Sequence, residues 1–380
     1  MFDEPGFIFW PVGTGDSTSI VIDDETIFQV DLRHLEKSED DADDHVAIVD
    51  RLVEELPKVD GSPYLAAFGL THPDKDHIQG FEELLDRVVI GELWFTPRIF
   101  REYHEDLCDD AVAFKKEADR RIAKMIETGG NAEAGDRLRL IGYDELLEEE
   151  KFEGFPPEYL TVPGNAVTEL DGADRVGAFR AFIHAPFKDD SDGERNDTSL
   201  AMQVVLSDDP SEGGALLFGD LKYPTIRKIF DVSKAAGNED NLAWKILLAP
   251  HHCSKSVMYQ DEGGSEVLKQ DILDDFEAAQ VGDGFVVASS EAIPAQNKKG
   301  DNPPHAKAKA RYEEIVAGDF LCTHEDGEAG EPLTFNWGDG DIVYEGAASA
   351  AAAKTDTIAE AIDDARGGDA PPSGKVGFGR

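Results

Sequence analysis

Short apolar runs separated by polar turns open the chain. They occupy residues 7–12, 19–22 and 26–32, with a glycine-rich turn at 13–17 and an acidic turn at 23–25 between them. Apolar runs of this length, bounded by Gly, Asp and Ser, are typical of β-strands. Three such strands within the first 32 residues predict an antiparallel start to a sheet.

The apolar positions then follow helical spacing and return to a strand. The first predicted helix is marked by Val46, Ile48, Val49, Leu52, Val53 and Leu56. Residues 64–70 form a strongly apolar run that predicts a buried strand. A second helix follows, with Ile78, Phe81, Leu84 and Leu85 on one face, and residues 88–95 predict one more strand.

The pattern changes from about residue 98 to residue 165. This segment is heavily charged, with Phe114, Ile122 and Ile126 spaced for one buried helical face and a glutamate-rich stretch at 145–153. We interpret it as a helical insertion. Such an insertion would form either a lid or substrate-selecting wall, or a simple surface elaboration.

Strand-like runs return in the second half of the chain. They lie at residues 178–185, 200–206, 215–218, 244–249, 285–288 and 320–323, and His305 opens a helix that continues through Tyr312 and Ile315. The two halves are of comparable size. This organisation predicts an α/β (α+β) fold in which two packed sheets carry helices outside, a four-layer αββα sandwich.

Composition supports a globular protein with an unusual surface. The chain has 380 residues, 41% of them hydrophobic, which is ample for a core. Its 36 basic and 80 acidic residues give a formal charge of −44. Such a surface repels nucleic acid at long range, since phosphate binding depends on Lys and Arg. Adaptation to a salty cytoplasm, where screening removes most of that repulsion, explains the charge equally well.

Cysteine usage and the N-terminus indicate a cellular compartment. Cys108, Cys253 and Cys322 are odd in number and far apart, which fits reduced thiols better than a disulfide framework. The first residues lack a basic region followed by an apolar core, and no apolar run approaches the roughly 20 residues of a membrane helix. We therefore expect a soluble, cytoplasmic protein that does not enter a membrane.

Histidines and carboxylates gather where three of the predicted strands end. His72, Asp74, Asp76 and His77 follow residues 64–70, Asp220 follows 215–218, and His251 and His252 follow 244–249. A single histidine at such a place is more often a cap than a ligand. Together, however, the residues supply carboxylate oxygen to bridge cations and imidazole for the remaining positions. The pattern predicts a hydrolytic site for two metal ions, whereas the Gly-Thr-Gly at 13–15 is a weak phosphate signal or a tight turn.

These motifs resemble a known family. The order His-x-Asp-x-Asp-His at 72–77, Gly-Asp at 219–220 and His-His at 251–252 is similar to the metallo-β-lactamase fold. More closely, the segments 12–16, 71–80, 196–200, 216–220 and 250–256 resemble the soluble hydrolase domain of the competence protein ComEC. The resemblance covers roughly residues 6–345 of a predicted hydrolase domain at 1–345, interrupted by the insertion. An Ala-rich tail at 346–380, helical or disordered, lies beyond it.

The resemblance implies a ligand set. His72 and Asp74 would hold the first metal, Asp76 and His77 the second, and Asp220 would bridge the two. The last ligand would be His252, with His251 as the fallback. The chain departs from the pattern at three positions. Asp74 replaces a histidine, Asn196 or Asp197 stands where a third histidine is expected, and Cys253 stands where the pattern has glycine. An oxygen-rich first site tolerates Mn²⁺ or Mg²⁺ better than an imidazole-rich zinc site does.

The implied reaction is hydrolysis of a phosphodiester, with DNA or RNA as first-choice substrate. The two cations would lower the pKa of a bridging water, and Asp76 would orient that water. His305 and Lys255 are candidates to neutralise charge on the phosphoryl group, with Ser254 and Ser256 as hydrogen-bond donors. The alternatives are hydrolysis of a small ester, lactone or nucleotide, or a binding module without catalysis. A protein partner or a second copy would dock through the tail or the insertion.

Overall fold

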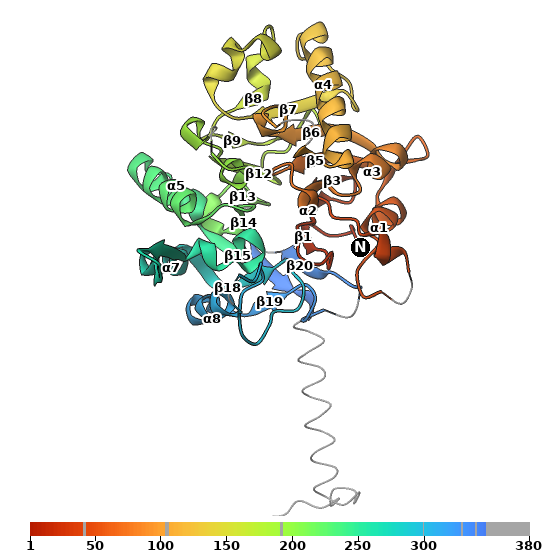
Figure 1. The fold of residues 1–380 in the computed structure, drawn as a ribbon. Helices are drawn as coiled ribbons and strands as arrows, with labels where there is room; N and C mark the ends of the chain where they lie inside the picture. Colours follow the sequence, from red (N-terminus) through yellow and green to blue (C-terminus); the bar gives the residue numbers. More distant parts are fainter. Residues whose placement is uncertain are drawn as a thin grey trace, which may run out of the picture.

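The structure is a computed structural model that describes residues 1–40, 43–102, 106–190, 193–298, 300–327, 330–338 and 340–346. Two large mixed sheets face each other, and helices cover both outer faces (Figure 1). The predicted αββα sandwich is therefore confirmed. The tail predicted at 346–380 lies outside the described residues from residue 347 onward.

The first sheet runs in the order β21-β20-β1-β2-β3-β5-β6-β7-β8, and β4 pairs with β5 at its side. Its strands are β1 (Gly6–Phe9), β2 (Thr18–Asp23), β3 (Thr26–Val30), β4 (Lys58–Val59), β5 (Ser62–Leu70), β6 (Val89–Phe95), β7 (Arg137–Ile141), β8 (Leu160–Thr161), β20 (Leu333–Gly338) and β21 (Asp341–Tyr344). The antiparallel start predicted for the first three strands is confirmed. From β3 to β8 the neighbouring strands are parallel.

The second sheet runs in the order β19-β18-β15-β14-β13-β12-β9. Its strands are β9 (Ala166–Val167), β12 (Arg180–Ala185), β13 (Ala201–Val205), β14 (Gly214–Leu217), β15 (Trp244–Leu248), β18 (Gln280–Ala288) and β19 (Phe320–Cys322). The strands from β14 to β19 are parallel. Two separate hairpins pair β10 (Glu169–Leu170) with β11 (Ala173–Asp174) and β16 (Tyr259–Glu262) with β17 (Ser265–Leu268).

Three apolar clusters hold the four layers together. On the first sheet the outer cluster packs α1 (Ile48–Glu55), α3 (Phe81–Arg87) and α4 (Asp109–Thr128) against the strands. The middle cluster fills the space between the sheets. On the second sheet the outer cluster holds α5 (Tyr223–Ala236), α7 (Gln270–Ala279) and α8 (Ala306–Ile315). Strands covered on both faces bury consecutive residues, which explains why they appear in the sequence as continuous apolar runs.

The segment predicted as a helical insertion is helical only in part. Its helix, α4, places Phe114 and Ile122 in the outer core as expected. However, β7 and β8 also belong to this segment and extend the first sheet. The prediction failed at β7 because Arg137 and Arg139 alternate with leucines there and give the strand a charged appearance. In the fold, Arg139 lies 3.5 Å from the buried carboxylate of Glu92.

Parallel strand ends position the polar residues. The carboxyl ends of β3, β5, β14 and β15 lead into the loops that carry Asp31, Thr71 to His77, Asp220 and His251. In parallel sheets these ends share one edge, which is where ligands bind in open α/β folds. In the described part of the chain, no helix is both long and apolar enough to cross a membrane.

Candidate metal centre

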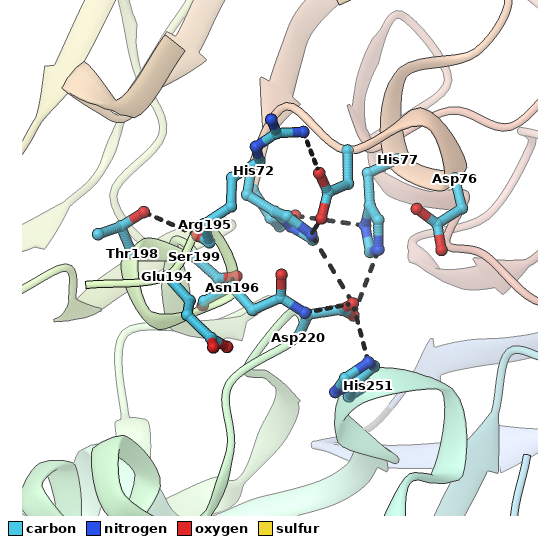
Figure 2. A network of polar contacts seen from close by, with 12 residues as sticks. His72, Asp76, His77, Glu194, Arg195, Asn196, Thr198, Ser199, Asp220 and His251 are labelled. Atoms are coloured by element: carbon cyan, nitrogen blue, oxygen red, sulfur yellow. Dashed lines mark hydrogen bonds and ion pairs between the residues drawn. The ribbon is translucent and has the colours of Figure 1, made fainter. Parts of the chain in front are cut away.

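Loops from both sheets bring the predicted ligands together. His72 follows β5, and His77 lies on the short helix α2 (Lys75–Ile78). Asp220 follows β14, and α6 (Pro250–Cys253) carries the two adjacent histidines. Figure 2 shows His72, His77 and His251 pointing toward the carboxylate of Asp220. Asp220 is only 3% exposed, so its charge must be balanced by groups inside the site.

One oxygen of Asp220 faces the first group of ligands. Its Oδ2 lies 3.7 Å from His72 Nε2 and 3.6 Å from His251 Nε2. The amide of Asn196 donates to the same oxygen at 3.3 Å, while His72 Nε2 lies 3.4 Å from Asp74 Oδ2. The first group therefore contains two imidazoles.

The other oxygen of Asp220 faces the second group. Its Oδ1 lies 3.3 Å from His77 Nε2 and 3.3 Å from His252 Nε2, and the two nitrogens are 3.2 Å apart. Ligand atoms around a tetrahedral cation at bond lengths of 2.0–2.1 Å are separated by about 3.3 Å. These three atoms therefore form a triangle of the size that a cation such as Zn²⁺ requires.

Asp76 borders the second group, and Asp16 lies behind it. Asp16 Oδ1 lies 3.4 Å from His252 Nδ1, the ring nitrogen opposite the one that faces Asp220, and Asp76 Oδ2 lies 3.5 Å from His252 Nε2. Four of these residues (Asp16, His77, Asp220 and His252) have ligand atoms that all lie within 4.8 Å of one another. Asp16 was predicted only as the last residue of the segment 12–16 that resembles the ComEC domain, without a role of its own.

A left-handed turn explains how both adjacent histidines reach Asp220. His251, His252 and Cys253 have φ angles of 51°, 53° and 61°. This conformation costs roughly 1–2 kcal/mol for each residue that is not glycine. The departure from glycine at Cys253 thus falls on a position that does have positive φ. The turn directs His251 toward one oxygen of Asp220 and His252 toward the other. The sequence left open which of the two histidines faces the site, and in the structure both do.

A buried carboxylate behind the ligands sets the orientation of His77. Asp31 Oδ2 lies 2.7 Å from His77 Nδ1, and the Asp31 carboxylate also accepts from the Thr71 N–H at 2.7 Å and from the Thr71 hydroxyl at 2.6 Å. A carboxylate on Nδ1 leaves Nε2 turned toward the site, the arrangement that metal-binding histidines use. Asp31 was not predicted, because one aspartate among so many acidic residues carries no local signal.

The electrostatics of the site suit bound cations. Burial alone would raise the pKa of Asp220, but the charges of His252 and His77 outweigh it and hold that pKa well below its usual range. Burial would lower the pKa of His252, yet Asp220 and Asp16 raise it to about 10. The buried carboxylates thus demand positive charge on the imidazoles or between them. Among the residues that the structure describes, the buried atoms His72 Nε2 and Asp220 Oδ1 find no hydrogen-bond partner, and a cation would satisfy them.

The neighbouring loop supplies Asn196 rather than Asp197. Asp197 Oδ2 accepts from the N–H of Glu194 at 3.2 Å, within its own loop. Arg195 donates to Asp74 Oδ1 at 2.5 Å and to Glu102 Oε2 at 2.9 Å. Asp74 is therefore shared between His72 and a guanidinium. This ion pair would compete with a cation for the same carboxylate.

The four residues predicted to contact substrate use their polar atoms elsewhere. Ser254 and Ser256 bond each other at 3.0 Å, and Lys255 pairs with Glu266. His305 Nδ1 accepts from the N–H of Lys255 at 3.3 Å, while its Nε2 donates to the carbonyl of Asp301 at 3.1 Å. These contacts hold His305 as a neutral imidazole that joins two loops. The roles predicted for these four residues at the phosphoryl oxygens stay predictions from the sequence.

Among the solved structures that this chain resembles are two distant likenesses. One is the metallo-β-lactamase fold protein YhfI from Bacillus subtilis, with 10% identity, a TM-score of 0.41, and coverage of 87% of this chain and 100% of that one. The other is Zn²⁺-bound PqqB from Methylobacterium extorquens, with 11% identity, a TM-score of 0.37, and coverage of 85% and 88%. No family model matches the chain, and no curated protein matches it significantly in sequence. The ComEC resemblance stays a prediction from the motifs, and the activity must be argued from the site itself.

Proposed function

We propose that this protein is a metal-dependent hydrolase that cleaves phosphodiester bonds. The observation that carries the proposal is the carboxylate of Asp220. Its Oδ2 faces His72 and His251, and its Oδ1 faces His77 and His252. One carboxylate between two separate pairs of imidazoles is the arrangement that two divalent cations need. Two bound cations would lower the pKa of a water molecule between them and polarise a phosphoryl oxygen.

The residues divide into two ligand groups around Asp220. The first group is His72, Asp74, Asn196 and His251, and the second is Asp76, His77 and His252, with Asp16 behind His252. Imidazole favours Zn²⁺, whereas carboxylate and amide oxygens suit Mn²⁺ and Mg²⁺. This mixed set supports two divalent ions, Zn²⁺ or Mn²⁺, with Mg²⁺ as a weaker substitute.

Asp76 is the carboxylate best placed to act on the attacking water. Its side chain is 37% exposed, whereas that of Asp220 is 4% exposed. Burial would raise the pKa of Asp76, but His252 and His77 hold it well below its usual value. Asp76 therefore stays ionised at neutral pH, where it accepts a hydrogen bond from water and orients it toward the substrate.

The substrate class rests on charge. The ComEC-like motifs favour DNA or RNA, yet two basic side chains near the site are already engaged by acids. Arg195 pairs with Asp74 and Glu102, and Lys222 pairs with Glu194 at 2.6 Å. A long nucleic acid would have to break such pairs against a net charge of −44. A short or small phosphodiester can bind without a continuous stripe of Lys and Arg side chains. These ion pairs therefore favour a small phosphodiester as the second candidate substrate.

The experiment compares substrates and metals on one preparation. Chelator-treated protein is reloaded with Mn²⁺, Zn²⁺ or Mg²⁺ and given single- and double-stranded DNA, RNA, a chromogenic phosphodiester, a lactone and a thioester. We expect phosphodiester cleavage, with Mn²⁺ restoring it at least as well as Zn²⁺. Asp76→Asn and His77→Ala should lose roughly 100-fold or more in kcat. Lys124→Ala, which breaks a surface pair with Glu127 on α4, should retain activity.

The outcomes separate the candidates. Cleavage of the chromogenic phosphodiester but not of DNA or RNA selects the small-substrate candidate over the nuclease. Equal cleavage by the wild type and by His77→Ala means that a contaminant is responsible. Cleavage of the lactone or thioester without any phosphodiester overturns the proposed reaction while leaving the metal centre in place.

A further inference from the structure

We propose a third cation site, formed by His45, Glu291 and His324 and separate from the centre around Asp220. The three side chains come from distant parts of the chain. His45 precedes α1, Glu291 follows β18, and His324 follows β19. Their ligand atoms all lie within 4.8 Å of one another. Two imidazoles and one carboxylate make up the protein ligand set of many zinc sites, so Zn²⁺ is the cation proposed.

The carboxylate of Glu291 again faces one histidine with each oxygen. Its Oε1 lies 3.0 Å from His45 Nε2, and its Oε2 lies 3.7 Å from His324 Nε2. These separations bracket the value of about 3.3 Å between ligands of a tetrahedral zinc ion. The two rings are 5.1 Å apart and inclined by 30°. The side chain of Glu291 is 45% exposed, which leaves one side of the site open for water as a fourth ligand.

Asp43 prepares His45 for this role. Its Oδ1 lies 2.5 Å from His45 Nδ1, and the same oxygen accepts from the His45 backbone N–H at 3.0 Å. With its proton held on Nδ1, the neutral imidazole presents a lone pair from Nε2. That lone pair then faces the Glu291 oxygen, an arrangement that is repulsive unless positive charge lies between them. The charge is a bound cation, a second proton on His45 or the ammonium group of Lys37.

Two basic side chains near the cluster bear on the choice. Lys37 Nζ lies 3.5 Å from His45 Nε2 and 3.7 Å from Asp43 Oδ2, but its side chain is 52% exposed and free to turn outward. Arg33 donates to the carbonyl of Thr14 and is held there. A divalent ion therefore needs the displacement of Lys37, and it would bind beside the Arg33 guanidinium, which interacts electrostatically with Glu291.

A cation at this cluster would hold the loop that carries Asp16. The Glu291 N–H donates to the Thr14 hydroxyl at 3.3 Å, and the Ser289 hydroxyl donates to the carbonyl of Gly15 at 2.6 Å. Asp16 then donates its N–H to the carbonyl of Asp76 at 3.2 Å. The site thus joins the N-terminal and C-terminal parts of the fold beside the metal centre. Its role is to stabilise the loop rather than to contact substrate.

The test counts zinc in the full-length protein. Chelator-treated wild type, His324→Gln and Glu291→Gln are dialysed against Zn²⁺ and analysed for metal, with circular dichroism to confirm folding. Each variant should hold one zinc ion fewer than wild type and show a smaller zinc-induced rise in melting temperature. His184→Gln is the matched control, because His184 is buried but bonds only the carbonyl of Asn241, at 2.8 Å. It should keep the wild-type zinc count.

An Asp220→Asn background separates this site from the proposed function. In that background the ions of the metal centre are weakened, and the zinc ion of the third site should still be lost on adding His324→Gln. Equal zinc counts with and without His324→Gln overturn the proposal, whatever the catalytic result. A melting temperature that depends on His45 and on pH but not on zinc also overturns it, because the second proton would then be the occupant.

Discussion

Replacing Asp31 with asparagine tests whether the layer behind the ligands controls metal binding. Asp31 is fully buried and has a positive φ of 56°. Its carboxylate accepts two hydrogen bonds from Thr71 and faces His77 Nδ1. An asparagine amide has one oxygen only. If that oxygen accepts from the Thr71 N–H, the amide NH₂ group takes the place of Oδ2 and faces the Nδ1–H group of His77; if it takes the place of Oδ2, the NH₂ group faces the Thr71 N–H. Two donors oppose each other in either case.

The magnitude follows from the bonds that are lost. Hydrogen bonds to a charged acceptor contribute about 1.5–3 kcal/mol each, and a buried donor without a partner costs a further 1–3 kcal/mol or so. Asp31→Asn should therefore lower the free energy of unfolding of the metal-free protein by about 2–4 kcal/mol. Loss of such an outer partner lowers metal affinity by roughly 10–100-fold, because the imidazole is no longer held in position.

Two assays measure these effects separately. Urea unfolding of the metal-free protein gives the stability change, and titration with Zn²⁺ against a competing chelator gives the affinity. Asp209→Asn is the matched control. Asp209 accepts from the N–H and the hydroxyl of Ser211, at 2.9 and 2.6 Å, as Asp31 does from Thr71, but on the surface. A folded Asp31→Asn protein with unchanged zinc affinity would refute the idea that Asp31 orients His77.

Three further predictions concern stability. Burial lowers the pKa of His184 to about 4, so the unfolded chain takes up its proton first and stability falls between pH 6.5 and 4. Urea unfolding at pH 7 and pH 4.5 should show that His184→Gln loses about 2–3 kcal/mol less on acidification than wild type, and parallel losses would contradict this. Phe114 is fully buried, with its ring 4.9 Å from that of Phe81. Phe114→Ala should therefore cost about 3–5 kcal/mol by urea unfolding, whereas a change below about 0.5 kcal/mol would mark α4 as a dispensable insertion. With a charge of −44, the free energy of unfolding should rise from low to molar KCl, and a flat or falling salt dependence would argue against self-repulsion.

Much of the architecture could be predicted because its strands are covered on both faces. The predicted run at 64–70 makes up most of β5. The predicted run at 244–249 contains the whole of β15 and extends one residue beyond its end. Such runs carry their signal in consecutive residues. The strand β7 carries no such signal, since Arg137 and Arg139 become acceptable in a sheet only when Asp171 and Glu92 are placed beside them. Propensity is local, whereas these ion pairs are made by tertiary packing.

The same distinction applies to the metal centre. The positions of histidines and aspartates after strands β5, β14 and β15 could be predicted from the sequence, because strand ends and polar loops are local features. The pairing of each Asp220 oxygen with its imidazoles, and the places of Asp16 and Asp31 beside them, depend on tertiary packing. Those facts depend on the register of parallel strands, on the left-handed turn at His251 and His252, and on the packing of one sheet against the other. A distance of 3.3 Å between residues far apart in the chain is set by the whole fold, so no pattern of neighbouring residues encodes it.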